Sequence, residues 1–202
     1  MADKDKNEQT DEELVAAYVD GQENAFGQLV ARHLSGVYTF ALRLVGDEHA
    51  AEDIAQEVFL KTWKSIYRYN PESSKFKTWI LRIARNTAID YLRKRKHIPF
   101  SEFSSTRDEE DGGGANLLAD VIPDPNPLPE ELFARTEDAE MVIHSVEMLS
   151  PRHREVLTLH YTNHLTFEEI GRMLGQPTNT VKSRHHRALI ALRTLLAPKD
   201  HE

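Results

Sequence analysis

One short stretch near the C-terminus carries amide, hydroxyl, imidazole and cationic side chains at the spacing of one helix face. These residues are Asn179, Lys182, Ser183, His186 and Arg187, with Thr178 before them and Arg184 beside them. Amide and guanidinium groups can read base edges in a DNA major groove, while cations and hydroxyls hold phosphates. No acidic residue follows until Asp200. The pattern predicts a helix whose first turns bind duplex DNA.

Local signals make this helix the second of a helix-turn-helix. Thr166 and Glu169 have the spacing of a capping box, and Gly175 can end the first helix in the left-handed conformation. Pro177 stops any continuation. We expect one apolar face of the second helix to be buried, namely Val181, Ala188, Leu192 and Leu195. The simpler alternative is a pair of packed helices with a solvated basic face.

A second candidate nucleic-acid surface lies along residues 76–97, which we expect to be helical. The outer side of this helix is expected to carry Arg82, Arg85, Asn86, Ile89 and Arg93, with Ile80, Ile83, Ala84, Thr87, Ala88 and Tyr91 inward. Aromatic residues crowd its entrance, namely Trp63, Tyr67, Tyr69, Phe76 and Trp79. Unpaired bases stack on rings while phosphates meet cations. Taken one at a time, however, such rings are more often core residues.

A third surface is polar and acidic, on a helix expected over about residues 47–67. The inward stripe of that helix is expected to be Ala51, Ile54, Ala55, Val58, Thr62, Trp63 and Ile66. On the other face lie Asp53, Gln56, Glu57, Leu60 and Lys64. Charge on a helix usually means a solvated face. A protein-binding face with Leu60 as its apolar anchor is the alternative.

The charge along the chain is unevenly distributed. The 202 residues carry a net charge of −8, but residues 75–100 carry +7 and residues 101–140 carry −10. The acidic, glycine- and proline-rich segment 98–133 cannot pack a core and is read as a flexible linker. Helical spacing elsewhere predicts an all-α protein with two helical domains, 10–97 and 134–196. Helices over about 23–33 and 35–45 are expected within the first domain.

Composition excludes several other classes. The chain has no cysteine, so thiol redox sensing and thiolate metal sites are excluded, and it has no apolar run of membrane-spanning length. We therefore expect a cytoplasmic protein with no membrane insertion. His160 and His164 lie four residues apart, but zinc would need further ligands, so we expect no metal and no cofactor. No phosphate loop or nucleophile elbow is present, so an enzyme is not expected.

Three stretches together resemble the bacterial RNA polymerase sigma factors of the extracytoplasmic-function group. They are DIAQEVFLKTW at 53–63, FKTWILRIARNTAIDYLRKRK at 76–96 and LSPRHREVLTLHYTNHLTFEEIGRMLGQPTNTVKSRHHRALIALR at 149–193. They occur in the order and at the spacing of that family, and they cover both expected domains. Three motifs in register make a chance match a poor explanation.

The resemblance implies partners for each of the three surfaces. The face with Asp53, Gln56, Glu57 and Leu60 would dock on the β′ clamp helices of core RNA polymerase, and the C-terminal domain on the β flap. The upstream promoter element would be captured as single strand, with a base turned out, by Tyr69, Phe76, Trp79, Arg82, Arg85, Asn86 and Arg93. The helix from Thr178 would read the distal element as duplex. The linker would run through the polymerase, and an anti-sigma protein is an expected partner.

Two departures and two alternatives remain open. Residues 69–76 are the most variable part of the family, and the pair His185 and His186 stands where the family tolerates many residues, so the promoter sequence cannot be read. The first alternative is a two-domain helix-turn-helix regulator that binds duplex DNA and a ligand or partner without joining polymerase. The second is a protein-binding adaptor, which the local basic charge disfavours.

Overall fold

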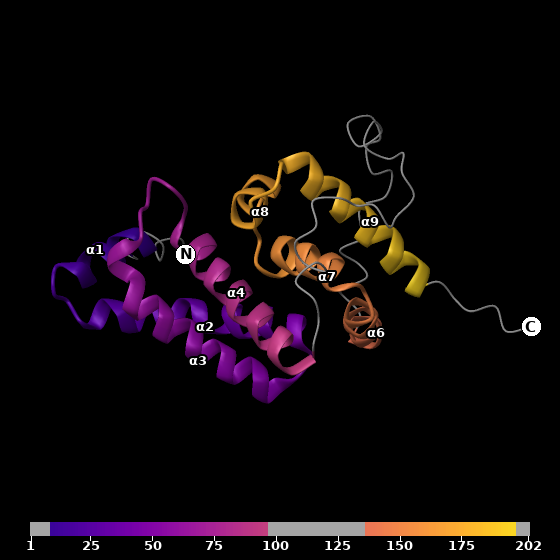
Figure 1. The fold of residues 1–202 in the computed structure, drawn as a ribbon, viewed down its shortest axis with the longest axis horizontal. Coiled ribbons are helices and arrows are strands. Elements are labelled where there is room, and N and C mark those ends of the chain that lie inside the picture. Colours follow the sequence, from indigo (N-terminus) through magenta and orange to yellow (C-terminus); the bar gives the residue numbers. More distant parts are fainter. Residues whose placement is uncertain (1–8, 97–135, 197–202) are drawn as a thin grey trace, which may run out of the picture. The chain divides into compact units, whose positions relative to one another are not determined.

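The computed structural model describes residues 9–96 and 136–196, and every regular element within those two ranges is a helix. This confirms the all-α prediction. The chain divides into two compact units, Met1–Tyr91 and Leu92–Glu202. Figure 1 colours the helices up to α4 indigo to magenta and those from α6 onward orange to yellow. The expected linker 98–133 lies outside the described residues.

The first two helices of the N-terminal unit follow their local signals with one exception. α1, Asp11–Val19, begins with a capping box, in which the Glu13 amide donates to the Thr10 hydroxyl and the Thr10 amide to the Glu13 carboxylate. α2, Asn24–Val45, ends at Gly46 with φ of 67°. The expected break near residue 34 is wrong, because α2 runs through it as one helix. A glycine inside a helix lowers the stability of that helix by only about 1 kcal/mol. Burial of Val37 and Phe40 by the continued helix offsets this loss.

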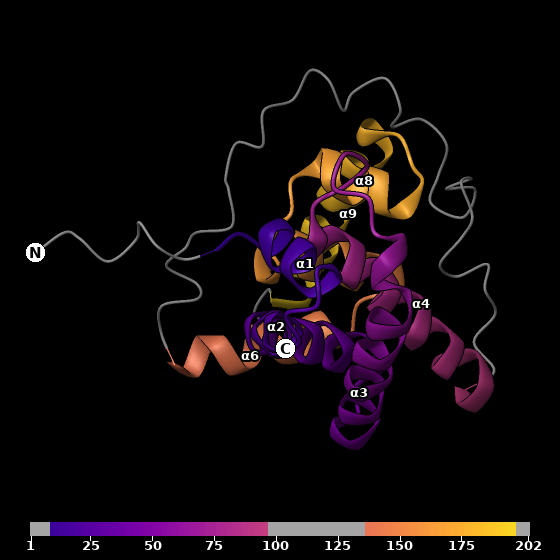
Figure 2. The ribbon, with the colours of Figure 1, turned by 90° about the vertical axis from the view of Figure 1, so that its left-hand side faces the viewer.

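The remaining helices complete this unit. α3, Glu48–Ser65, is followed by the short 3₁₀ helix η1, Ile66–Arg68, and by α4, Phe76–Lys96. α3 and α4 lie side by side in both views (Figures 1 and 2). The largest fully buried side chains of the unit are Leu14, Leu29, Phe40, Ile54, Ile66, Phe76, Ile80 and Leu81.

Two residues of this unit fall on a different face from the one expected. Trp63 was expected in the inward stripe of α3, yet this residue is 49 % exposed and its Nε1–H donates to the Tyr18 hydroxyl at 2.7 Å. Phe59 takes an inward place instead. Ile89 was expected on the outer side of α4, but it is buried. Both residues lie near the edge of a helical stripe, where the packing of neighbouring helices decides burial.

The C-terminal unit is built from α6, Thr136–Glu147, α7, Pro151–Leu157, a wider π-helical turn η4, Thr158–Thr162, then α8, Phe167–Leu174, and α9, Thr178–Leu196. The capping box of Thr166 and Glu169 is present, and Gly175 ends α8 at φ of 67°, as predicted. Leu195 was expected to be buried, but residues 193–195 at the end of α9 are exposed and Leu189 is buried in its stead. Among the described residues, no helix has the length and apolar character needed to cross a membrane.

Candidate nucleic-acid and polymerase interfaces

The turn of the helix-turn-helix depends on a close approach between α8 and the chain that follows it. The Gln176 amide donates to the Gly171 carbonyl at 2.9 Å. A Cβ added at Gly171 would lie 2.8 Å from the Gln176 carbonyl oxygen, closer than real Cβ atoms come to backbone. Only glycine therefore fits at this point. The sequence analysis missed Gly171, although a glycine in the middle of the first helix was a visible signal.

The exposed side of α9 presents an amide, a cation and an imidazole in one line. Asn179, Lys182 and His186 are exposed at i, i+3 and i+7, and we call these three residues the α9 face. Thr178 and Arg187 border it and are half-buried. This line fits the groove-facing side of a recognition helix.

Two residues expected on that face are not there. Ser183 is 6 % exposed and Arg184 only 2 % exposed. Each residue of a helix turns by about 100°, so Arg184 lies on the side that buries Val181 and Ala188, whereas Ser183 is a buried residue at the edge of the α9 face. Neither side chain can touch a base or a phosphate in this structure. Both side chains therefore contribute to the packing of α9 and not to its exposed face.

The segment from the end of η1 to the first residue of α4, residues 69–76, forms a folded loop that we call the capture loop. The Asn70 side chain accepts the Glu72 amide at 2.9 Å, and the Ser73 amide donates to the Asn70 carbonyl at 3.1 Å. The Tyr69 ring packs edge-on against Phe76 at 5.6 Å and near Trp79 at 5.3 Å, measured between ring centroids. The loop is thus held by its own turn and by an aromatic cluster.

The residues expected to bind single-stranded DNA divide into an exposed group and a supporting group. Arg82, Asn86 and Arg93 are exposed along α4, whereas Arg85, Tyr69 and Trp79 are half-buried. Phe76 is completely buried, so it cannot stack on a base. This expectation was wrong because the Phe76 ring packs between His33 of α2 and the aromatic cluster.

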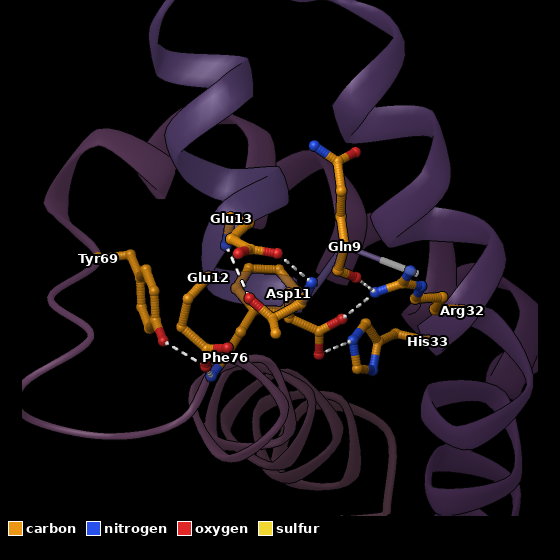
Figure 3. A network of polar contacts seen from close by, with 9 residues as sticks. Gln9, Asp11, Glu12, Glu13, Arg32, His33, Tyr69 and Phe76 are labelled. Carbon is orange, nitrogen blue, oxygen red and sulfur yellow. Dashed lines mark hydrogen bonds and ion pairs between the residues drawn. The ribbon is translucent and has the colours of Figure 1, made fainter. Parts of the chain in front are cut away.

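Polar contacts connect the start of α1 to α2 and to the capture loop (Figure 3). Asp11 lies 2.7 Å from His33 Nε2 and 3.2 Å from the Arg32 guanidinium. The hydrogen bond with His33 is the largest cause that lowers the pKa of Asp11 below its usual value, partly opposed by burial. Glu12 faces the loop instead, where it accepts from the Tyr69 hydroxyl at 3.2 Å. Sequence patterns gave no indication of this network.

The acidic surface of α3 is exposed as the sequence predicts. Asp53, Gln56, Glu57 and Leu60 are all exposed, Leu60 to 56 %, and we call these four residues the α3 face. Lys61 lies 2.8 Å from the Glu57 carboxylate and donates to the Thr87 hydroxyl of α4 at 3.0 Å. Single exposed apolar side chains are common on protein surfaces, so the exposure of Leu60 is compatible with a protein-binding face and with a solvated one.

The histidines take part in packing contacts. The His160 ring stacks on Phe167 with centroids 4.5 Å apart, and its Nδ1 lies 2.9 Å from the Leu165 carbonyl oxygen. His185 Nε2 lies 3.2 Å from the Tyr161 hydroxyl. Within residues 9–96 and 136–196, no group of three or more His, Cys, Asp or Glu side chains could hold a metal ion.

Two family models match the chain. The model of sigma-70 region 2 matches residues 29–98, which include the α3 face, the capture loop and α4. The model of sigma-70 region 4 matches residues 146–194, which include α7 to α9.

Curated relatives cover nearly the whole chain. The ECF RNA polymerase sigma factor SigW of Bacillus subtilis is 33% identical over 176 residues, 87% of this chain and 91% of the relative. The ECF RNA polymerase sigma-E factor of Escherichia coli K12 is 31% identical over 194 residues, covering 94% and 95%.

Solved structures agree with these matches. CnrH, solved in complex with the cytosolic domain of CnrY, is similar with a TM-score of 0.65 and 26% identity over 93% of this chain and 97% of that chain. The fold is shared also by RpoE of Bartonella quintana, solved with the anti-sigma factor NepR, with a TM-score of 0.62 and 23% identity over 86% and 97%.

Proposed function

The chain belongs to the ECF RNA polymerase sigma factors, and we propose that it directs core RNA polymerase to specific promoters and promotes strand opening there. The observation that carries this function is the presence of both sigma regions in one chain, 29–98 and 146–194, each with an exposed surface that fits its task. RNA synthesis stays with the polymerase. The chain itself supplies binding surfaces, and we expect it to work in the cytoplasm beside the polymerase.

For the α3 face we propose the polymerase clamp helices as its partner. Leu60 supplies an exposed apolar anchor, and the carboxylates beside it supply charge that can match cationic groups across an interface. The removal of Leu60 from water would favour association, while the charges would select the partner. Binding of a protein partner is therefore the role that we propose for the α3 face.

For the capture loop and α4 we propose the separated strand of the upstream promoter element. Arg82, Asn86 and Arg93 are exposed along one side of α4, so cations can follow the phosphates while the Asn86 amide reads a base edge. A base must leave its stack before a side chain can reach its pairing edge. Binding the unstacked base therefore favours the open state of the duplex.

For the α9 face we propose the distal promoter element in duplex form. Asn179 can read adenine or another base edge, while Lys182 and His186 can contact phosphates or bases in the major groove. The tight turn at Gly171 fixes α9 against α8 and so orients this face.

We further propose an anti-sigma protein as a regulatory partner. The solved structures of CnrH and of Bartonella quintana RpoE each hold a second protein, named in the latter case as an anti-sigma factor. Such a partner could bury exposed apolar residues of this chain, which include Leu60, Met141 and Met148. Because the sequence has no cysteine, a thiol-based redox signal would have to be sensed by that partner.

The experiment that tests the function is run-off transcription with purified core polymerase. With the chain added, we expect a transcript of one length from a cognate promoter, and none from core polymerase alone. The alternative, a helix-turn-helix regulator, predicts tight specific binding by the free chain and no change in start-site choice by core polymerase. That outcome would replace our proposal with the regulator.

A further inference from the structure

Glu12 at the start of α1 holds both ends of the capture loop. Its Oε1 accepts a hydrogen bond from the Tyr69 hydroxyl at 3.2 Å and another from the Phe76 backbone amide at 3.3 Å. Tyr69 and Phe76 are the first and last residues of the loop, and Figure 3 shows Glu12 between them. Glu12 lies before residue 29, where the match to sigma-70 region 2 begins. No surface assigned above includes it.

The contact with Phe76 places a carboxylate at the N-terminus of α4. The first amides of a helix have no partner within the helix, and the helix dipole favours negative charge there. The first turn of α4 contains no acidic residue of its own. Glu12 therefore supplies, from another helix, an acceptor and a negative charge at the start of α4.

The contact with Tyr69 fixes the other end of the loop. The Tyr69 hydroxyl lies 2.9 Å from the Ser74 carbonyl oxygen, so its single proton is shared between that oxygen and Glu12. Burial, followed by the nearby charge of Glu12, raises the pKa of Tyr69 well above its usual value. The hydroxyl thus stays protonated and remains a donor.

The helix that carries Glu12 is itself anchored. The neighbouring Asp11 contacts both Arg32 and His33 of α2, at 3.2 and 2.7 Å. Leu14 and Val15 of α1 are buried in the core. Glu12 therefore holds the loop from a position that is fixed relative to the rest of the unit.

We propose that Glu12 is a positioning residue for strand opening, which sets the shape in which the capture loop accepts an unpaired base. The inference rests on the proposed role of that loop. In this arrangement the loop is preorganised, so less order has to be imposed when the base arrives. α1 thereby becomes part of the promoter-opening machinery.

The test compares Glu12→Ala with Glu12→Gln, Tyr69→Phe and the double variant Glu12→Ala/Tyr69→Phe. Glutamine keeps an acceptor oxygen without the charge, and phenylalanine keeps the ring contacts without the hydroxyl. The matched control is Glu13→Gln, one residue along the same exposed end of α1. Glu13 makes the capping box with Thr10 and has no contact with the loop, and glutamine also suits that position.

The measurements use the full chain with core polymerase. They are the rate of open-complex formation on a paired promoter, the same rate on a template unpaired across the upstream element, and the preference among the four bases at the captured position. Glu12→Ala should slow opening of the paired promoter about 3- to 10-fold, as loss of roughly one hydrogen bond would. On the unpaired template, Glu12→Ala should regain part of the lost rate. The differences in rate among the four bases at the captured position should become smaller.

The other variants make the expectation specific. The opening rate of Glu12→Gln should lie between those of the original protein and Glu12→Ala, because glutamine keeps the acceptor but not the charge. The opening rate of Glu13→Gln should match that of the original protein. Because Glu12 and Tyr69 act through one contact, the double variant should be slowed by less than the product of the two single effects. Polymerase affinity should stay unchanged in all of them.

Two results overturn the inference, and they are distinguishable from a failure of the proposed function. If Glu12→Ala lowers thermal stability or polymerase affinity but keeps the original base preference, Glu12 is merely structural. If Asn86→Ala alters the preference and Glu12→Ala does not, the inference fails while the role of α4 and its loop stands. If neither Asn86→Ala nor Glu12→Ala changes the base preference, the proposed role of the loop fails, and the inference fails with it.

Discussion

Lys61 and Glu57 form an ion pair along α3, with 2.8 Å between the ammonium nitrogen and the carboxylate oxygen. The same ammonium donates to Thr87 on α4. Of the two carboxylates on the α3 face, Glu57 thus also helps to join two helices, whereas Asp53 makes no ion pair or hydrogen bond within the described residues. Asp53 is therefore the cleaner position at which to test polymerase binding.

Reversing the charge at Asp53 should weaken binding of core polymerase without unfolding the protein. Surface substitutions move the free energy of unfolding by only about 0.5 kcal/mol either way, so Asp53→Lys should keep its melting temperature. Glu57→Lys should weaken binding too, but it also breaks the pair with Lys61. The measurement is polymerase affinity by titration of a labelled chain.

Asp20→Lys is the matched control for this prediction. Asp20 is exposed at the end of α1, so this variant makes the same change of charge away from the α3 face. The Asp20→Lys chain should bind polymerase more tightly than Asp53→Lys. Equal binding by all three variants and the original protein would remove the α3 face as the interface.

The α9 face should separate base reading from phosphate contact. Loss of a good base contact at Asn179, or at Arg187 on the border of this face, should cost about 1–3 kcal/mol at one base pair only. Lys182→Ala should weaken all duplexes alike and reduce the dependence of log K on log salt by about one unit. Binding is measured with the polymerase complex on a set of single-base promoter variants at several salt concentrations. Ser183→Ala is the internal control, since its side chain is buried.

The helix-turn-helix should not accept a methyl group at Gly171. Gly171→Ala places a Cβ 2.8 Å from the Gln176 carbonyl oxygen, and such overpacking costs about 1–3 kcal/mol. Gly27→Ala is the same substitution inside α2, where nothing lies within 4 Å of the new Cβ. It should instead stabilise the chain by about 0.5–1 kcal/mol. Calorimetry of the two variants should show shifts of opposite sign, and equal shifts would contradict the tight turn.

The Asp11–His33 contact predicts acid sensitivity of the N-terminal unit. Because the pKa of folded Asp11 is lowered, its contribution to stability is present above its usual pKa of 3.8 and is lost as pH falls through the lower folded value. Asp11→Asn should therefore be less stable than the original protein above pH 3.8, and the gap in stability should close as the pH falls below that value. Asp20→Asn, at the other end of α1, serves as control. A gap that stays constant with pH would contradict the assignment.

Local chemistry could be predicted from the sequence, whereas contacts between distant residues could not. Thr10, Thr166 and Gly175 act within four residues of their partners, so their capping roles were visible in the sequence. The contact of Glu12 with Tyr69 spans 57 residues and has no local pattern.

Burial at the edge of a stripe was also beyond sequence reasoning. Phe76 and Arg184 were expected at nucleic-acid surfaces and are buried. Which neighbouring helix covers a residue decides such cases, and periodicity within a single helix cannot specify it.

Permanganate footprinting of a paired promoter tests the central claim most directly, because permanganate oxidises unpaired thymines. Three reactions are compared: core polymerase alone, the chain alone, and the two together. We predict reactive thymines from the upstream element to the start site only when both are present, with the signal on this paired promoter reduced by Asn86→Ala. Reactivity that is the same with and without the chain would contradict the claim that this protein opens promoters for polymerase.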